Sequence, residues 1–227
     1  MSFRSVLRRT AALLCLCLPA WVVAAAEPLS VVNDFDAALM GAMRNAHALG
    51  PKGRFERLGP VMGEKFDLEA MTRDIAGPHW NKLTGEQKEK LVAAFSRFEV
   101  AIFADWFDSD AGQSFQVKDI VTRNDEIATV GVDLSVSPKP LRLEYVLRAD
   151  PSGSWRIVDV RYEGWMSTVE RRRSEFSELF NHEGYDVLMA RLEEKGAELL
   201  DHPDNPASSH LREPLRDLWN ISFAPIF

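Results

Sequence analysis

Apolar residues in the first third of the chain recur at intervals of three and four, the spacing of one face of an α-helix. The first such run extends from residue 32 to 49 and comprises Val32, Phe35, Leu39, Met43 and Ala46. The sequence Gly-Pro-Lys-Gly at 50–53 ends this predicted helix. Shorter helical segments are predicted at residues 55–62 and 68–75.

A longer helix is predicted from residue 84 to about residue 107. Thr84 and Gln87 form a capping box, in which each side chain satisfies a free backbone N–H of the other residue. The apolar stripe of this helix consists of Leu91, Phe95, Phe98, Ile102 and Trp106. This helix should therefore bury one face along its whole length.

After Gly112 the period of the pattern changes from 3.6 to 2, which predicts strands. Four strands are expected, at residues 115–121, 128–136, 141–147 and 155–162, with a turn at Asp150-Pro151-Ser152-Gly153. They follow one another without intervening helices, so the sheet should be antiparallel. Two helices, at 168–180 and 185–200, then complete an α+β domain in which helices cover a four-stranded sheet.

The first 26 residues have the features of a cleaved secretory signal peptide. Arg4, Arg8 and Arg9 precede an apolar stretch, and Ala24-Ala25-Ala26 supplies the small residues that signal peptidase requires. An uncleaved membrane anchor is the alternative, although the apolar run is short for a span of about 20 residues. The sequence thus predicts a signal peptide at 1–26, a domain at 27–200 and an extension at 201–227.

Charge and cysteine content narrow the range of functions. The net charge is −7 for the whole chain. Residues 1–26 hold three arginines and no acid, so the remainder has 24 basic and 34 acidic residues and a net charge of −10. Such a surface argues against nucleic-acid binding. Cys15 and Cys17, the two cysteines of the chain, both lie within the predicted signal peptide, which excludes disulfides and thiolate sites from the exported form.

The C-terminal extension is unusually apolar for a tail that is punctuated by prolines. Its large apolar residues are Leu211, Leu215, Leu218, Trp219, Ile221, Phe223, Ile226 and Phe227. Two interpretations stay open. The extension is either a strap packed on its own domain or a segment that docks on a partner.

Sequence motifs for catalysis are nearly absent. The chain lacks nucleophile-elbow, phosphate-loop, dinucleotide and zinc-protease motifs, and its five histidines are not at metal-ligand spacing. The sequence Asn-Asp-Phe-Asp at 33–36 lacks the glycine and glutamate of a calcium loop, and we interpret it as the polar face of the first helix. Asp133 and Asp159 are candidate general bases with Tyr145, but their phase in the strands favours solvated, outward positions.

A basic triplet, Arg171, Arg172 and Arg173, lies in the first of the two closing helices. Such a run is most often a solvated helix face. In an acidic protein it also suggests a surface on which a partner docks.

Three segments together resemble a known family. The first, residues 66–95, contains Phe66-Asp67-Leu68-Glu69-Ala70-Met71 and Gly77-Pro78-His79-Trp80. The second, residues 141–160, contains Leu141-Arg142-Leu143-Glu144-Tyr145 and Trp155-Arg156-Ile157-Val158-Asp159-Val160. The third, residues 163–192, contains Gly184-Tyr185-Asp186-Val187-Leu188. This set resembles the periplasmic lipid-binding, MlaC-like proteins of toluene-tolerance and lipid-asymmetry transport systems. Arg172-Arg173-Ser174-Glu175-Phe176 is most similar to the hopanoid-biosynthesis-associated, HpnM-like branch.

The resemblance implies a scoop of the nuclear-transport-factor class with an apolar pocket between sheet and helices. It also implies a non-enzymatic carrier of phospholipid or hopanoid, without cofactor or metal, that contacts membranes transiently. The implied partners are an inner-membrane ABC transporter and an outer-membrane lipoprotein. Alternation and helical phase then select the expected pocket lining: Met71, Ile75, Phe98, Ile102, Val130, Val132, Leu134, Leu143, Tyr145, Val158, Val160, Met166 and Val169.

Two other functions stay open at this point. The first is a small scoop-fold enzyme that uses Asp159 or Asp133 with Tyr145 on a hydrophobic substrate. The second is a structural adaptor that binds the transporter through its C-terminal extension.

Overall fold

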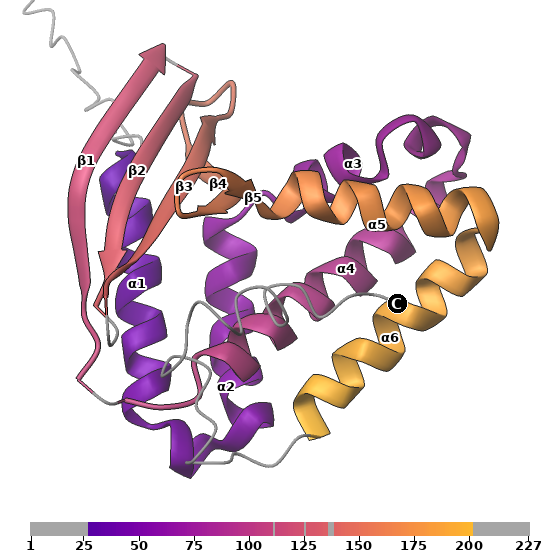
Figure 1. The fold of residues 1–227 in the computed structure, drawn as a ribbon. Helices are drawn as coiled ribbons and strands as arrows, with labels where there is room; N and C mark the ends of the chain where they lie inside the picture. Colours follow the sequence, from indigo (N-terminus) through magenta and orange to yellow (C-terminus); the bar gives the residue numbers. More distant parts are fainter. Residues whose placement is uncertain (1–26, 111, 125, 136–138, 202–227) are drawn as a thin grey trace, which may run out of the picture.

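The structure is a computed structural model, and it describes residues 27–110, 112–124, 126–135 and 139–201 (Figure 1). The predicted signal peptide and almost all of the C-terminal extension lie outside the described residues. Helices come first along the chain, strands follow, and two helices close the domain. The α+β class expected from the sequence is confirmed.

The helix expected over residues 32–49 is divided by a break at Asn45, and a kink follows at Gly50. α1 spans Pro28–Arg44 and α2 spans Ala46–Lys65. Within α2, Gly50 has a φ of 62° and a non-helical backbone, so the regular helix is interrupted there. A positive φ strains residues that carry a Cβ, which explains why the predicted helix end coincides with this glycine.

The remaining helices lie close to their predicted bounds. α3 spans Leu68–Ala76 and leads through a 3₁₀ helix at Gly77–Lys82 into α4, Gly85–Trp106. The predicted capping box is present in full: the Gln87 backbone N–H donates to Thr84 Oγ1 at 3.1 Å, and the Thr84 N–H donates to Gln87 Oε1 at 2.9 Å. α5 spans Thr168–His182 and α6 spans Tyr185–Asp201.

The sheet is antiparallel throughout, with its strands in chain order. β1 is Phe115–Asn124, β2 Ile127–Leu134, β3 Leu141–Ala149, β4 Trp155–Tyr162 and β5 Met166–Ser167. The predicted count of four was wrong, because β5 adds a fifth, two-residue strand to the edge of β4. Glu163 and Gly164 make this turn with φ values of 51° and 76°. The nuclear-transport-factor-like scoop stays a prediction.

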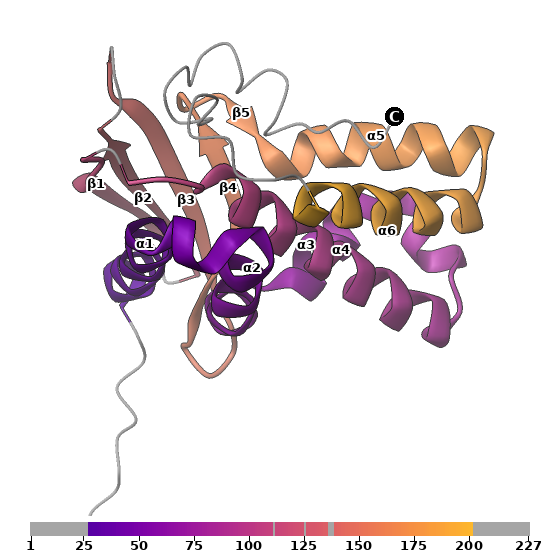
Figure 2. The ribbon, with the colours of Figure 1, turned by 90° about the horizontal axis from the view of Figure 1, so that it is seen from below.

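The helices lie on one side of the twisted sheet and then extend beyond its β5 edge. α1 packs against β2 and β4, while α3, α4, α5 and α6 form a helical layer that reaches away from the strands (Figures 1 and 2). β1 is the edge strand farthest from these helices in the sheet order, and its residues from Gln116 onward are exposed.

The alternation of β2 and β3 places one row of each strand in the core, as predicted. Their inward residues are all between 0% and 2% exposed: Ala128, Val130, Val132, Leu134, Leu141, Leu143, Tyr145 and Leu147. All of these residues except Ala128 belong to a single apolar cluster that continues through the inner faces of α1, α3, α4, α5 and α6. The core of the domain is therefore the interface between the sheet and the helices.

Candidate functional site

The expected pocket residues converge on the interface between sheet and helices. The buried members, each at most 8% exposed, are Met71, Ile75, Phe98, Ile102, Val130, Val132, Leu134, Leu143, Tyr145, Val160 and Val169. All eleven belong to the single apolar cluster. Met166, on β5, is partly buried and packs against its margin. The structure thus brings these residues into one region, and their contact with a ligand stays a prediction.

Val158 departs from the expected alternation because β4 contains a β-bulge. The register passes from Val146 opposite Asp159 to Leu147 opposite Ile157, so Val158 has no partner on β3. An extra residue in one strand reverses the phase of the side chains beyond it. As a result Ile157 and Val160 face the core, whereas Val158 is only partly buried.

A buried carboxyl group lies inside this apolar cluster. The Tyr145 hydroxyl donates to Asp36 Oδ1 at 2.8 Å, and the two residues are 1% and 6% exposed. Burial raises the pKa of Asp36 from 3.8 to about 7, and the hydrogen bond from Tyr145 opposes that rise. Burial also raises the pKa of Tyr145. From the sequence, Asp36 was expected on the polar face of the first helix, and this prediction was wrong, because Asp36 is buried.

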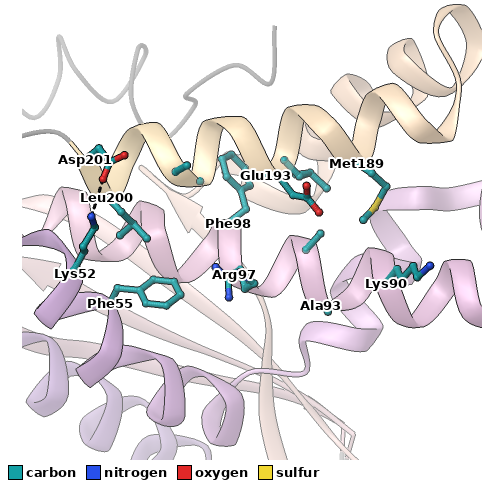
Figure 3. Close-up of a pocket in the computed structure, with 14 residues that line it drawn as sticks. Lys52, Phe55, Lys90, Ala93, Arg97, Phe98, Met189, Glu193, Leu200 and Asp201 are labelled. Carbon is teal, nitrogen blue, oxygen red and sulfur yellow. Dashed lines mark ion pairs between the residues drawn. The ribbon is translucent and has the colours of Figure 1, made fainter.

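A groove of about 740 Å³ lies between α2, α4 and α6, and we call it the α4–α6 groove (Figure 3). Its volume is within the range of small-molecule sites. Its lining consists of Lys52, Phe55, Lys90, Ala93, Ala94, Arg97, Phe98, Met189, Leu192, Glu193, Gly196, Ala197, Leu200 and Asp201. Phe98 is the one residue of the expected pocket that also lines this groove, so it joins the groove to the core.

The two aspartates considered as general bases have structural partners. Asp133 accepts from Arg142 at 3.2 Å and faces Lys118 at 3.7 Å, on the outer side of the sheet, as predicted. Asp159 pairs with Val146, in the outer row of β3, but the solvated environment expected for it was wrong, because it is 8% exposed. Its Oδ1 atom accepts from the Thr168 hydroxyl at 3.0 Å and the Val169 N–H at 3.1 Å, at the first turn of α5.

The three arginines of the predicted docking surface have different environments. Arg172 is 2% exposed, which contradicts a role in surface docking. Its guanidinium donates to Glu175 at 2.8 Å, lies 3.5 Å from Glu99 and stacks over the Phe98 ring at 4.8 Å. Burial raises the pKa of Glu99. Arg171 is partly exposed and Arg173 exposed, so docking through these two residues stays a prediction.

Sequence reasoning missed the buried charges, although the helical spacing contained a signal for two of them. Asp36 lies four residues after Val32 and three before Leu39, and Glu99 lies four after Phe95 and three before Ile102. Both therefore fall within an apolar stripe. No comparable sequence pattern indicates the α4–α6 groove, because its walls come from three separate helices.

Neither a metal centre nor a membrane span is found in the part of the chain that the structure describes. No three or more histidine, cysteine, aspartate or glutamate side chains are grouped there as metal ligands. None of the described helices combines the length and apolar character needed to cross a membrane.

Comparison with known proteins agrees with this architecture. The family model described as MlaC protein matches residues 34–194. The phospholipid-binding protein from Ralstonia solanacearum, solved in complex with a phospholipid, has a similar fold, with a TM-score of 0.68 and 17% sequence identity. The match covers 77% of this chain and 99% of that chain. Among curated proteins, none matches.

Proposed function

The chain belongs to the MlaC family, and on this basis we propose that it is a phospholipid carrier rather than an enzyme, with the acyl chains held between sheet and helices. The observation that carries the proposal is the single apolar cluster at this interface, in which the expected lining residues meet. The similarity to a protein solved with a bound phospholipid supports the same ligand class.

The physical requirement for such a carrier is to remove acyl chains from water. Each Å² of apolar surface transferred from water contributes about 25 cal/mol, so a wall of aliphatic and aromatic side chains suffices. Met71 and Met166 add flexible side chains that can adapt to chains of different shape. An apolar wall of this kind needs no acid, base or metal.

The cellular setting is part of the proposal. The signal-peptide features of residues 1–26 favour export to the periplasm, where the protein would shuttle lipid between membranes together with an ABC transporter. The acidic exterior supports release from an anionic membrane after each contact. Release from anionic vesicles that does not change with salt concentration would contradict this last point.

Photo-crosslinking locates the ligand directly. The protein is loaded from vesicles that contain a phospholipid with a photoreactive acyl chain, and the crosslinked residues are mapped by mass spectrometry. We expect crosslinks on the inner faces of β2, β3 and α4, for example at Val132, Leu143 and Ile102. Crosslinks confined to α6 residues such as Met189 would place the lipid in the α4–α6 groove instead. A hopanoid probe tests the ligand that the resemblance of residues 172–176 implies.

A matched pair of substitutions tests the same site without a probe. Val132→Trp adds a bulky side chain to the fully buried wall, whereas Val121→Trp adds it to β1, where Val121 is 54% exposed. Provided that circular dichroism shows both variants folded, we expect Val132→Trp to lower phospholipid uptake at least tenfold and Val121→Trp to leave it unchanged. Equal uptake by the two variants would contradict the proposed location.

A further inference from the structure

The α4–α6 groove is apolar at its centre and open to solvent. Phe98 and Leu192 at its base are 0% and 1% exposed, and Phe55, Met189 and Leu200 are partly exposed around them. Figure 3 shows Phe55, Phe98 and Met189 pointing into the space between α2, α4 and α6. An open apolar groove of this size marks a binding site for a ligand or a polypeptide segment.

Small residues let a polypeptide segment approach the helices closely. Ala93 and Ala94 on α4, and Gly196 and Ala197 on α6, all line the groove. A Cβ atom at Gly196 would lie 3.8 Å from the Phe98 Cα atom, so the two helix backbones are close at that point. These small residues leave open space between the larger apolar side chains, a shape that accepts side chains from a docked segment.

The chain itself continues from one end of this groove. Asp201, the last residue of α6, lines the groove and pairs with Lys52 at 2.8 Å. Residues 202–227 therefore start at the groove. The family match ends at residue 194, so these residues lie beyond the part of the chain that matches the family model.

The added residues have the right composition and enough length. Eight of the 17 residues from 211 to 227 are large and apolar, as set out above. The nine residues 202–210 that precede them span up to about 30 Å when extended. The 17-residue helix α6 is about 25 Å long, so the apolar segment can reach every part of the groove.

We propose that residues 211–227 dock in the α4–α6 groove of their own chain. The rim of the groove and the segment both carry basic and acidic residues, so neither presents charge of one sign alone. Apolar contacts therefore supply the binding energy. Attachment through a short linker gives an effective concentration of about 1 mM, which favours the chain's own segment over that of a second copy.

Site-directed crosslinking tests this docking. Because Cys15 and Cys17 both lie in residues 1–26, protein beginning at Glu27 offers a cysteine-free background. A benzophenone attached at Ala93→Cys or Ala197→Cys should crosslink to residues 211–227 of the same chain, and one at Thr122→Cys on β1 should not. Crosslinks between two chains, crosslinks to bound lipid or an absence of groove crosslinks would each overturn the proposal.

Proteolysis gives a second readout that needs no label. Trypsin can cut the segment after Arg212 and Arg216. If docking has an intrinsic Kd of about 0.1 mM against an effective concentration of about 1 mM, cleavage is slowed about tenfold. Ala197→Trp, which fills the groove, should abolish this protection, whereas Val121→Trp should retain it. Cleavage of all three proteins at one rate would overturn the proposal. Phospholipid uptake measured on the same samples separates this outcome from a failure of the carrier function.

Discussion

Asp36 is the residue with the most unusual environment in the core. Asp36 is 6% exposed, and its carboxyl group accepts a hydrogen bond from the hydroxyl of Tyr145, another buried group. Because burial raises its pKa from 3.8 to about 7, the folded protein binds a proton at this site more tightly than the unfolded chain does. The contribution of Asp36 to the free energy of unfolding is fully present below pH 3.8 and is lost as the pH rises through about 7.

Replacement of Asp36 by asparagine should remove this pH dependence. For the unsubstituted protein, we expect this group to lower the free energy of unfolding by roughly 2–3 kcal/mol between pH 5 and pH 8. Asp36→Asn keeps an acceptor for Tyr145 and does not titrate, so its unfolding free energy should fall less over the same range. Urea unfolding at both pH values measures the difference. Parallel pH profiles for the two proteins would contradict a raised pKa at Asp36.

Arg172 should matter for stability, in contrast to its neighbour Arg173. Arg172→Met removes the cation that Glu99 and Glu175 share and leaves Glu175 paired with Arg171 alone, so we expect it to lower the free energy of unfolding by about 3–5 kcal/mol. Arg173→Met, at an exposed position, should cost no more than about 1 kcal/mol. Denaturant unfolding compares the two variants.

A third variant keeps this test informative if Arg172→Met does not fold. Glu99→Gln and Glu175→Gln added to Arg172→Met remove the unbalanced charges together, and this combination should recover much of the lost stability. Equal stability of Arg172→Met and Arg173→Met would contradict a buried charge cluster.

At the scale of elements, local signals predicted most of the fold. The capping box of α4 is made by two side chains three residues apart, and both of its hydrogen bonds form. The alternation of β2 and β3 likewise depends on neighbours in the sequence. The bulge at Val158 and the two-residue strand β5 were missed, because register depends on pairing with other strands and not on the strand's own sequence.

The α4 cap offers a quantitative check at this scale. Thr84→Ala removes the oxygen that accepts from the Gln87 N–H, and we expect it to lower the free energy of unfolding by about 1 kcal/mol. For a domain of this size, that corresponds to a fall in Tm of roughly 2–4 °C. Ser177→Ala, on the partly exposed face of α5, is the control and should change Tm by less than half as much. Identical Tm values for the two variants would show that the cap contributes nothing.

At the scale of the whole molecule, the sequence predicted which residues are buried but not the shape of the surface. The inner residues of β2, β3 and α4 share one cluster because each is apolar and in phase with its own element. The α4–α6 groove arises where α2, α4 and α6 meet, and no local pattern encodes the angles between helices distant in the chain. The family match is the basis on which lipid binding is proposed for this architecture.

The proposed carrier function is best tested on protein purified from the periplasm of its own cells. Native mass spectrometry detects the bound material, and organic extraction then identifies it. The carrier function predicts one phospholipid per chain, released on denaturation and absent from the Val132→Trp variant. A protein that is empty when isolated, and that takes up no lipid from vesicles, would contradict it.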